Sequence, residues 1–404
     1  MARRDEVGGG PARMAARWRL LALPGLGFGS FVLEGVAAAR RASPYAEVPA
    51  VEPSLRVIAE AALDRSFSLG MNLLTGVPHP TTVRRAQAEA EAMARFAGER
   101  GFHADPAAYH RTPDAPGEVS RRRARAWGGT RLLSYEQLFF ASGYTPHSKE
   151  PGGRRWQKHP RNHTVAAQLL EHEGEPRPWV VCVHGFGMGT PIPNFAAFRV
   201  DRLHRGHGWN VVLPSLPLHG PRGSTRISGG EVLAPDYLRL VHLFAQGVWD
   251  VRRLIAWIRA RGGTRIALYG LSLGAYVSAL VASLEDDLAG VIAGIPAVDF
   301  PNVARDNEPW VMRRYGSDAV VDWEEVRAAT HAVSPLALQP RVPRERRFIF
   351  AGTADRVARP DQARALWRHW DRCAIHWFPG GHVAAHFNPT VAPFVDASLE
   401  ACLE

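Results

Sequence analysis

The sequence predicts an α/β protein with a mostly parallel central sheet and helices on both faces. From about Leu132 onwards, short apolar runs rich in β-branched residues alternate with longer stretches of helical character, which is the pattern of βαβ units. The short runs are apolar almost throughout, as expected of parallel strands buried on both sides. With 404 residues, 46% of them hydrophobic, the chain can bury a large core.

Residues 1–45 are predicted to form an N-terminal arm. Three arginines between positions 13 and 19 precede the apolar stretch Leu20–Leu33, an order that resembles the charged and apolar regions of a signal segment. Pro24 and several glycines weaken a helix there, and the stretch is shorter than the roughly 20 apolar residues that span a bilayer. We expect an arm lying on the domain, and the sequence leaves peripheral membrane contact through residues 13–41, or a cleaved signal, as alternatives.

Residues 46–131 are predicted to form a helical N-terminal extension and a linker. One helix is expected over 54–74, because apolar residues recur on one face, and a second over 81–102, where Glu and Arg alternate on the outer side. The stretch 104–129 is rich in Pro, Gly and Arg and is predicted to be a loop. Its arginine run at 121–123 is predicted to be a solvated face.

Residues 132–404 are predicted to form the main domain. Its predicted strands are Thr164–Leu170, Trp179–Val183, Asn210–Leu216, Arg265–Tyr269, Gly290–Ile295, Arg347–Ala351 and Ala374–Phe378. Its predicted helices lie near Tyr237–Arg261, Leu273–Leu284, Gln362–Trp370 and Pro393–Leu403. Helical stretches between strands allow neighbouring strands to run parallel.

Charge and cysteine content exclude several classes of protein. The net charge is +10, but all except two of the 49 Lys and Arg residues are arginines scattered along the chain, so no nucleic-acid partner is predicted. Cys182, Cys373 and Cys402 form an odd set without a CxxC pair, so neither a disulfide framework nor a metal site is expected. This usage suits a reducing compartment. A cytoplasmic location is expected, and the N-terminal arm leaves membrane association open.

The strongest chemical signal is a G-x-S-x-G motif between a strand and a helix. Strand Arg265–Tyr269 runs into Gly270-Leu271-Ser272-Leu273-Gly274, and an apolar helix follows. The neighbours two residues away must be small, because strand and helix pass closely at such a turn. Ser272 is therefore predicted to be a nucleophile at the carboxyl edge of the sheet, beside the amides of a helix N-terminus.

Three further turns follow strands at the same edge. Trp179–Val183 ends in His184-Gly185-Phe186-Gly187, where the N–H of Phe186 could join that of Leu273 in a two-donor oxyanion hole. Strand Arg347–Ala351 leads to Asp355, and Ala374–Phe378 leads through Pro-Gly-Gly to His382. The chain order is Ser, Asp, His.

These four motifs resemble the α/β-hydrolase superfamily, and the resemblance covers Thr164 to the C-terminus. It implies a nucleophilic Ser272, a general base and acid at His382, and an orienting carboxylate at Asp355, with no cofactor. Some members place the carboxylate one strand earlier, so Asp299 is the alternative acid.

The substrate pocket is expected near two other segments. The turn Leu216-Pro217-Leu218-His219-Gly220-Pro221-Arg222 is similar to one in a poorly characterised subgroup of α/β-hydrolase-domain proteins. His219 or Arg222 could contact a carbonyl or an anionic head group, or the turn could simply be rigid. His184 borders the same pocket.

An insertion at about 300–345 lies where this superfamily carries a cap. Its aromatic residues, Trp310 among them, are candidates for an apolar acyl pocket or for the core of the cap. A serine at the turn selects acyl transfer to water. The expected function is hydrolysis of a small-molecule or lipid carboxylic ester. A serine peptidase and a non-catalytic binding protein are the alternatives, and the oligomeric state is left open.

Overall fold

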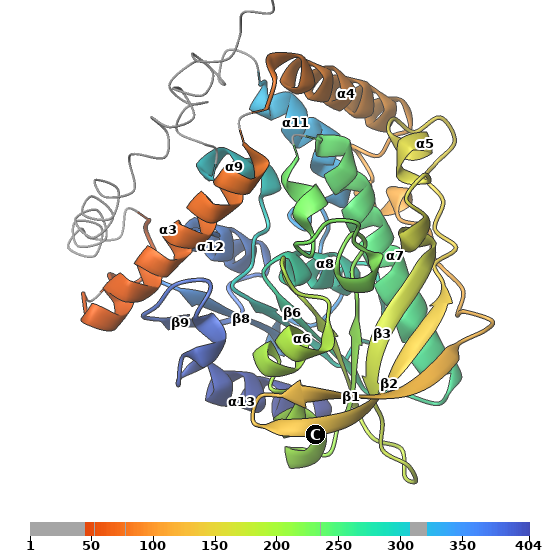
Figure 1. Ribbon diagram of the computed structural model, residues 1–404, viewed down its shortest axis with the longest axis vertical. Coiled ribbons are helices and arrows are strands. Elements are labelled where there is room, and N and C mark those ends of the chain that lie inside the picture. Colours follow the sequence, from red (N-terminus) through yellow and green to blue (C-terminus); the bar gives the residue numbers. More distant parts are fainter. Residues whose placement is uncertain (1–44, 52, 77, 235, 308–320) are drawn as a thin grey trace, which may run out of the picture.

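The computed structural model describes residues 45–404 apart from 52, 77, 235 and 308–320 (Figure 1). The predicted membrane contact at 13–41 and the candidate pocket residue Trp310 therefore lie outside the described residues. No helix in the described part of the chain is long and apolar enough to cross a membrane.

The described strands form one nine-stranded sheet in the order β1-β2-β3-β5-β4-β6-β7-β8-β9. The strands are β1 (Ser120–Gly128), β2 (Arg131–Ala141), β3 (Thr164–Leu170), β4 (Trp179–Val183), β5 (Asn210–Pro214), β6 (Ile266–Leu271), β7 (Gly290–Gly294), β8 (Arg347–Gly352) and β9 (Ala374–Phe378). Strands β1, β2 and β3 pair antiparallel, as do β3 and β5, and the other pairs are parallel. The seven predicted strands are all present, with ends that differ by at most two residues.

Helices cover both faces of this sheet. The longer helices of the main domain are α6 (Pro191–Ala197), α7 (Tyr237–Ala260), α8 (Leu273–Ala282), α9 (Phe300–Asp306), α11 (Trp323–Thr330), α12 (Pro360–His369) and α13 (Val391–Leu403). Along β4, Val181 and Val183 join the core that includes α7, α8 and α12, whereas Val180 and Cys182 join the core that includes α6 and α13. The alternation follows from the two-residue period of a strand. The predicted α/β sheet with two covered faces is confirmed.

Shorter helical turns connect these elements. They occupy Gly153–Trp156 (α5), Pro106–Tyr109, Pro160–His163, Arg202–Gly206, Gly220–Arg222, Gly230–Leu233, His331–Val333, Arg344–Arg346 and Ala385–Phe387.

The prediction of a loop over 104–129 was wrong at its C-terminal end. Strand β1 lies there and pairs with β2, with Arg123 opposite Glu136. Most of its side chains are exposed or half-buried, and four of its nine residues are arginines. Alternation in β1 is limited to Ala124 and Ala126, which lie between exposed residues and pack half-buried against the core. This signal is too short to predict a strand.

The N-terminal extension consists of two helices, α3 (Leu55–Thr75) and α4 (Pro80–Glu99), close to their predicted positions. The Ser54 hydroxyl caps α3 by accepting a hydrogen bond from the N–H of Val57. Helix α4 packs against α11 and α7. Helix α3 lies apart from it (Figure 1), where the Ser68 hydroxyl donates to the side chain of Asn307, just after α9. The extension thus reaches the edge of the sheet at which the candidate catalytic residues lie.

Candidate active site

Ser272 lies in the sharp turn that joins β6 to α8. Its backbone has φ 54° and ψ −114°, a strained conformation for a residue with a side chain. A Cβ atom at Gly274 would lie 1.9 Å from the carbonyl oxygen of Val183, and one at Gly270 would lie 2.3 Å from that of Gly274. The two glycines of the motif are therefore required by close backbone contacts, and these contacts hold Ser272 at the carboxyl end of the strand.

His382 lies between Ser272 and Asp355. Its Nε2 is 2.9 Å from the Ser272 Oγ, and its Nδ1 is 2.7 Å from the Asp355 Oδ2. His382 and Asp355 are buried, at 9% and 2% exposure, while Ser272 is partly exposed. The structure thus brings together three residues that stand on different turns of the sequence.

The hydrogen bonds of Asp355 determine which ring nitrogen of His382 carries the proton. The Asp355 Oδ1 accepts from the N–H groups of Val357 and Ala358, both at 2.8 Å. A carboxylate that accepts on both oxygens orients His382 with its proton on Nδ1. Nε2 is then left with a lone pair that can accept the hydroxyl proton of Ser272.

The pKa of His382 depends on its burial and on two nearby carboxylates. Burial acts to lower its pKa, but the Asp355 carboxylate and, to a smaller extent, Asp64 raise the pKa above its usual 6.5. An imidazole of this kind gains a proton readily from a nearby hydroxyl group.

Two backbone N–H groups border Ser272. Gly185 packs against it, since a Cβ there would lie 3.4 Å from the Ser272 Cβ. Within the described residues, the N–H groups of Phe186 and Leu273 have no hydrogen-bond acceptor. Leu273 is the first residue of α8, where helix amides lack intrahelical partners. The two N–H groups predicted for the oxyanion hole thus lack an acceptor in the described structure, as that predicted role requires.

The predicted pocket residues are buried instead of lining an open surface. His184 is fully buried; its Nδ1 contacts the carbonyl of Gly185 and its Nε2 accepts from the N–H of Leu216. Burial lowers its pKa to about 3, so it is neutral. His184 braces the turn that carries Phe186, as expected of a structural histidine.

His219 and Arg222 were candidates for contact with a substrate, with a rigid turn as the alternative, and the structure buries both. Arg222 is 2% exposed and pairs with Asp250 at 2.8 Å, and it also donates to the carbonyl of Ser215. His219 is fully buried, and burial lowers its pKa to about 4. An arginine at the end of a turn is expected to be exposed to solvent. Here the turn folds inward and places Arg222 against the buried carboxylate of Asp250.

Asp299 does not contact His382. It caps α9 by accepting from the N–H of Asn302, and it forms an ion pair with Arg327 at 2.8 Å. Of the two candidate acids, Asp355 is the one in hydrogen-bond contact with the histidine.

Two acidic residues that the sequence did not point to reach the site from α3. Asp64 accepts hydrogen bonds from the N–H groups of His382 and Val383, and Glu60 accepts from that of Gly381. Their spacing of four residues on a largely apolar helix face is the signal that could have marked them.

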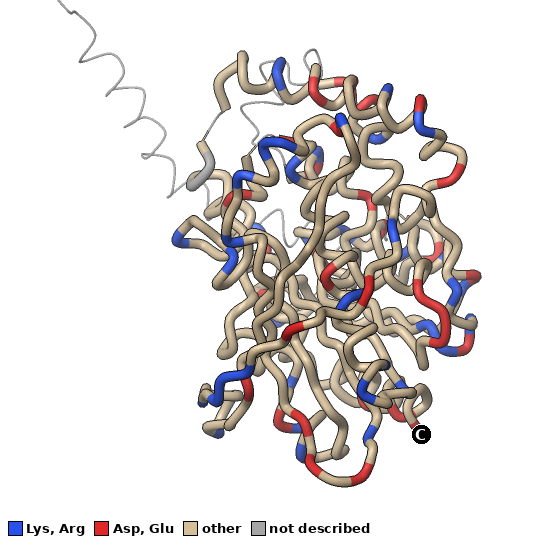
Figure 2. Tube along the Cα trace, turned by 90° about the vertical axis from the view of Figure 1, so that its right-hand side faces the viewer, with Lys and Arg blue, Asp and Glu red and all other residues tan. Residues whose placement is uncertain are grey.

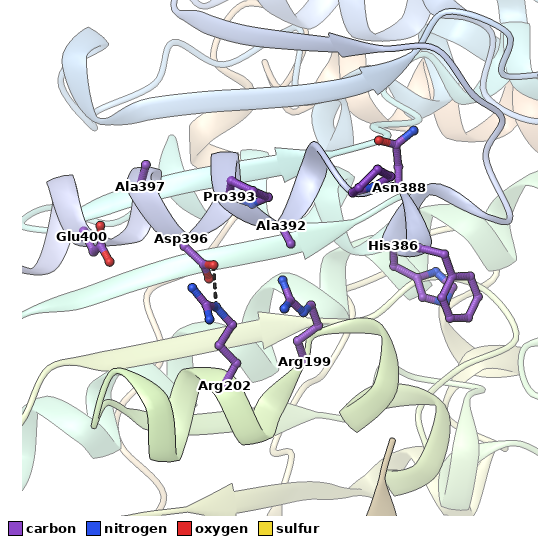
Figure 3. Close-up of a pocket in the computed structure, with 11 residues that line it drawn as sticks. Arg199, Arg202, His386, Asn388, Ala392, Pro393, Asp396, Ala397 and Glu400 are labelled. Carbon is purple, nitrogen blue, oxygen red and sulfur yellow. Dashed lines mark hydrogen bonds and ion pairs between the residues drawn. The ribbon is translucent and has the colours of Figure 1, made fainter. Parts of the chain in front are cut away.

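A surface cavity of about 630 Å³ lies elsewhere, between α13 and the segment that follows α6. Figure 3 shows Arg199 and Arg202 pointing toward α13, with Arg202 bonded to Asp396 at 2.5 Å. Ser272, Asp355 and His382 are not among its lining residues. The cavity is separate from the candidate active site.

No group of three or more His, Cys, Asp or Glu side chains in the described part of the chain could hold a metal ion. Cys182, Cys373 and Cys402 are all free and buried.

The comparisons with known proteins agree with this architecture. Residues 180–394 match the model of the alpha/beta hydrolase family. The chain belongs to the α/β-hydrolase family.

Two relatives of this chain are named as uncharacterized proteins. An uncharacterized protein of Mycobacterium tuberculosis (strain CDC 1551 / Oshkosh) is 39% identical over 362 residues, which is 88% of this chain and 84% of the relative. An uncharacterized protein from another strain of that species matches at the same identity and length. An acetyl xylan esterase from Thermoanaerobacterium superposes with a TM-score of 0.51 and 14% identity, over 75% of this chain and 93% of that one. This likeness shows the shared fold.

Proposed function

We propose that this protein is a serine hydrolase that cleaves carboxylic esters through an acyl-enzyme intermediate. The observation that carries the proposal is the position of His382, within hydrogen-bond distance of both the Ser272 hydroxyl and the Asp355 carboxylate. A serine hydroxyl is a weak nucleophile until a base within reach removes its proton.

In the acylation step, the Ser272 Oγ attacks the ester carbonyl carbon while its proton passes to the Nε2 of His382. The carbonyl oxygen gains the negative charge, which the N–H groups of Phe186 and Leu273 stabilise. When the tetrahedral intermediate collapses, the bond to the leaving oxygen breaks, and His382 returns its proton to that oxygen. The alcohol departs and the acyl group remains on Ser272.

Deacylation repeats the sequence with water. His382 removes a proton from the water molecule as its oxygen attacks the acyl carbon. The Ser272 oxygen is the leaving group, and it recovers its proton from His382. The carboxylic acid is released and the resting hydrogen bonds re-form. Asp355 accepts the Nδ1 hydrogen bond throughout and stabilises the imidazolium.

The contacts around the oxyanion turn support an uncharged, apolar acyl group. The ring of Phe186 contacts that of Phe67 from α3 at a centroid distance of 6.3 Å. The Phe186 ring also packs on His219, which is fully buried and neutral and so adds no charge beside the turn. An apolar acyl chain suits the partly exposed rings of Phe67 and Phe186 better than a charged one. A lipid acyl ester is a member of this substrate class.

The proposal is tested by replacing the nucleophile. Ser272→Ala should reduce turnover of p-nitrophenyl acetate by about 10⁴-fold or more, because no other group in the site forms the acyl-enzyme. Ser278→Ala is the matched control, since Ser278 is a fully buried serine of α8, the helix that follows Ser272. Circular dichroism should show that both variants stay folded.

Other outcomes would identify other functions. Full activity of the Ser272→Ala variant would contradict the assignment of the nucleophile. Faster hydrolysis of aminoacyl p-nitroanilides than of esters would indicate a serine peptidase. A folded protein that turns over neither substrate would be a binding protein on the same frame.

A further inference from the structure

Helix α3 precedes the residues that match the α/β-hydrolase family. It holds the loop that carries His382. Asp64 accepts three backbone hydrogen bonds: from the N–H of His382 at 2.7 Å, of Val383 at 2.9 Å and of Arg356 at 3.0 Å. One carboxylate thus ties the turn after β9 to the turn after β8. These two turns carry His382 and Asp355.

A second carboxylate on the same helix extends this contact. Glu60, one helical turn before Asp64, accepts from the N–H of Gly381 at 3.0 Å and pairs with Arg56 at 2.7 Å. Asp64 is fully buried and Glu60 is 8% exposed. Two acceptors on one helix face therefore fix three successive amides of the histidine loop.

The glycines before His382 are explained by the same helix. A Cβ atom at Gly380 would lie 2.4 Å from the Glu60 Oε2, and one at Gly381 would lie 2.8 Å from the Asp64 Oδ2. The loop approaches α3 so closely that a Cβ at either position would displace one of the two carboxylates. The close packing of this loop on α3 therefore depends on glycine at both positions and on the carboxylates of Glu60 and Asp64.

The groups that face Asp64 come from three segments. His382 lies on the loop after β9, Asp355 and Arg356 lie on the loop after β8, and Glu60 belongs to α3 itself. Arg65, also on α3, acts through its charge on Arg356. Burial and the nearby charge of Asp355 raise the pKa of Asp64 to about 6, against the opposite effects of His382 and the backbone donors. At neutral pH the carboxylate is therefore charged.

We infer that Asp64 is a positioning residue for catalysis, which holds the His382 backbone in register with Asp355 and favours the imidazolium that forms during acyl transfer. This inference rests on the proposed function. Asp64 does not touch Ser272 and acts through His382. The N-terminal extension is then part of the catalytic unit rather than an appendage, and α3 also contacts the oxyanion turn through Phe67.

Two variants separate positioning from charge. Asp64→Ala removes all three acceptor bonds, and kcat for p-nitrophenyl acetate should fall by about 10²-fold with KM nearly unchanged, because displacement of a catalytic group affects the transition state. Asp64→Asn keeps the shape but loses the charge and at least one acceptor. Its kcat should fall less, by about tenfold.

The pH profile is the decisive readout. The Asp64 carboxylate raises the pKa of His382, so its loss lowers that pKa. The acid limb of kcat/KM for Asp64→Asn should therefore move to lower pH, by up to about one unit. A merely structural role would reduce activity without moving the limb.

Asp236→Asn is the matched control. Asp236 is a buried carboxylate that caps α7, another helix, by accepting from the N–H of Arg239. Asn is an equally good cap, so this variant should keep the wild-type rate and pH profile.

The inference would be overturned if Asp64→Asn had the wild-type kcat and an unshifted acid limb, or if it lost activity without a shift. Labelling by a fluorophosphonate probe separates this result from failure of the proposed function. An unlabelled wild-type protein would refute the proposed hydrolase. If the wild-type protein is labelled and Asp64→Asn keeps the wild-type kcat and acid limb, only the role of Asp64 is refuted. Should Asp64→Ala not fold, the Asn variant alone decides.

Discussion

At the scale of single residues, the site depends on which atoms the Asp355 carboxylate engages. One oxygen accepts from two backbone N–H groups and the other from His382. This division sets the histidine tautomer, and the tautomer decides whether Nε2 can accept a proton from Ser272. The charge on Asp355 and the direction of its hydrogen bonds are both needed.

Replacement of this carboxylate should therefore be costly. In Asp355→Asn the amide oxygen would stay with the backbone N–H groups, and the amide nitrogen would donate to Nδ1 of His382. The imidazole would then carry its proton on Nε2, facing Ser272, and kcat should fall by about 10⁴-fold. Stopped-flow or steady-state ester hydrolysis measures this. Asp299→Asn is the comparison, and a larger loss in that variant would mean that Asp355 is not the acid.

The pH dependence follows from the same histidine. His382 must be neutral to act as a base, so kcat/KM should fall as the pH drops through its pKa. Because Asp355 and Asp64 raise that pKa against the effect of burial, the midpoint should lie above 6.5. A rate that stays flat between about pH 5 and 8 would exclude histidine as the base.

At the scale of elements, glycines decide where strands, helices and turns can meet. Gly274 lets α8 pass the end of β4, and Gly352 lets β8 pass the histidine loop, where a Cβ would lie 2.4 Å from the carbonyl oxygen of Gly380. These close contacts hold the ends of β6, β8 and β9 at one edge of the sheet, where β7 separates β6 from β8. The catalytic geometry is therefore a property of how closely the elements pack.

Two glycine substitutions test this point through their effect on the free energy of unfolding. Gly274→Ala should destabilise the fold by at least about 3 kcal/mol, because its Cβ meets a backbone carbonyl that cannot move aside. Gly70→Ala lies inside α3 with open space around the added atom. It should stabilise the protein by about 0.5–1 kcal/mol. Denaturant unfolding of both variants gives the two values, and equal values would contradict the packing argument.

Sequence patterns predicted the elements of the main domain because buried parallel strands and apolar helices leave local signals. The turn motifs also predicted which residues stand at strand ends. The contact of Asp64 with His382 joins residues 318 positions apart, and no local pattern encodes it. Strand β1 was missed because its half-buried face carries only the small residues Ala124, Ala126 and Gly128. The inward fold of Arg222 was missed because its partner, Asp250, lies on another element.

At the scale of the whole molecule, the extension and the family domain meet at the catalytic edge. Helix α3 touches the histidine loop, the segment after α9 and the oxyanion turn. Figure 2 shows acidic and basic residues interspersed along the trace. Many arginines in the described part of the chain are paired with carboxylates, as Arg222 is with Asp250, so much of the basic charge there is balanced locally.

The central claim is that Ser272 is an activated nucleophile, and covalent labelling tests it most directly. A fluorophosphonate reacts when the serine oxygen attacks phosphorus and fluoride leaves. Peptide mass spectrometry of the labelled full-length protein should find one adduct on Ser272, which should disappear in Ser272→Ala and be strongly reduced in Asp355→Asn. An adduct on another residue, or none on the folded wild-type protein, would contradict the account.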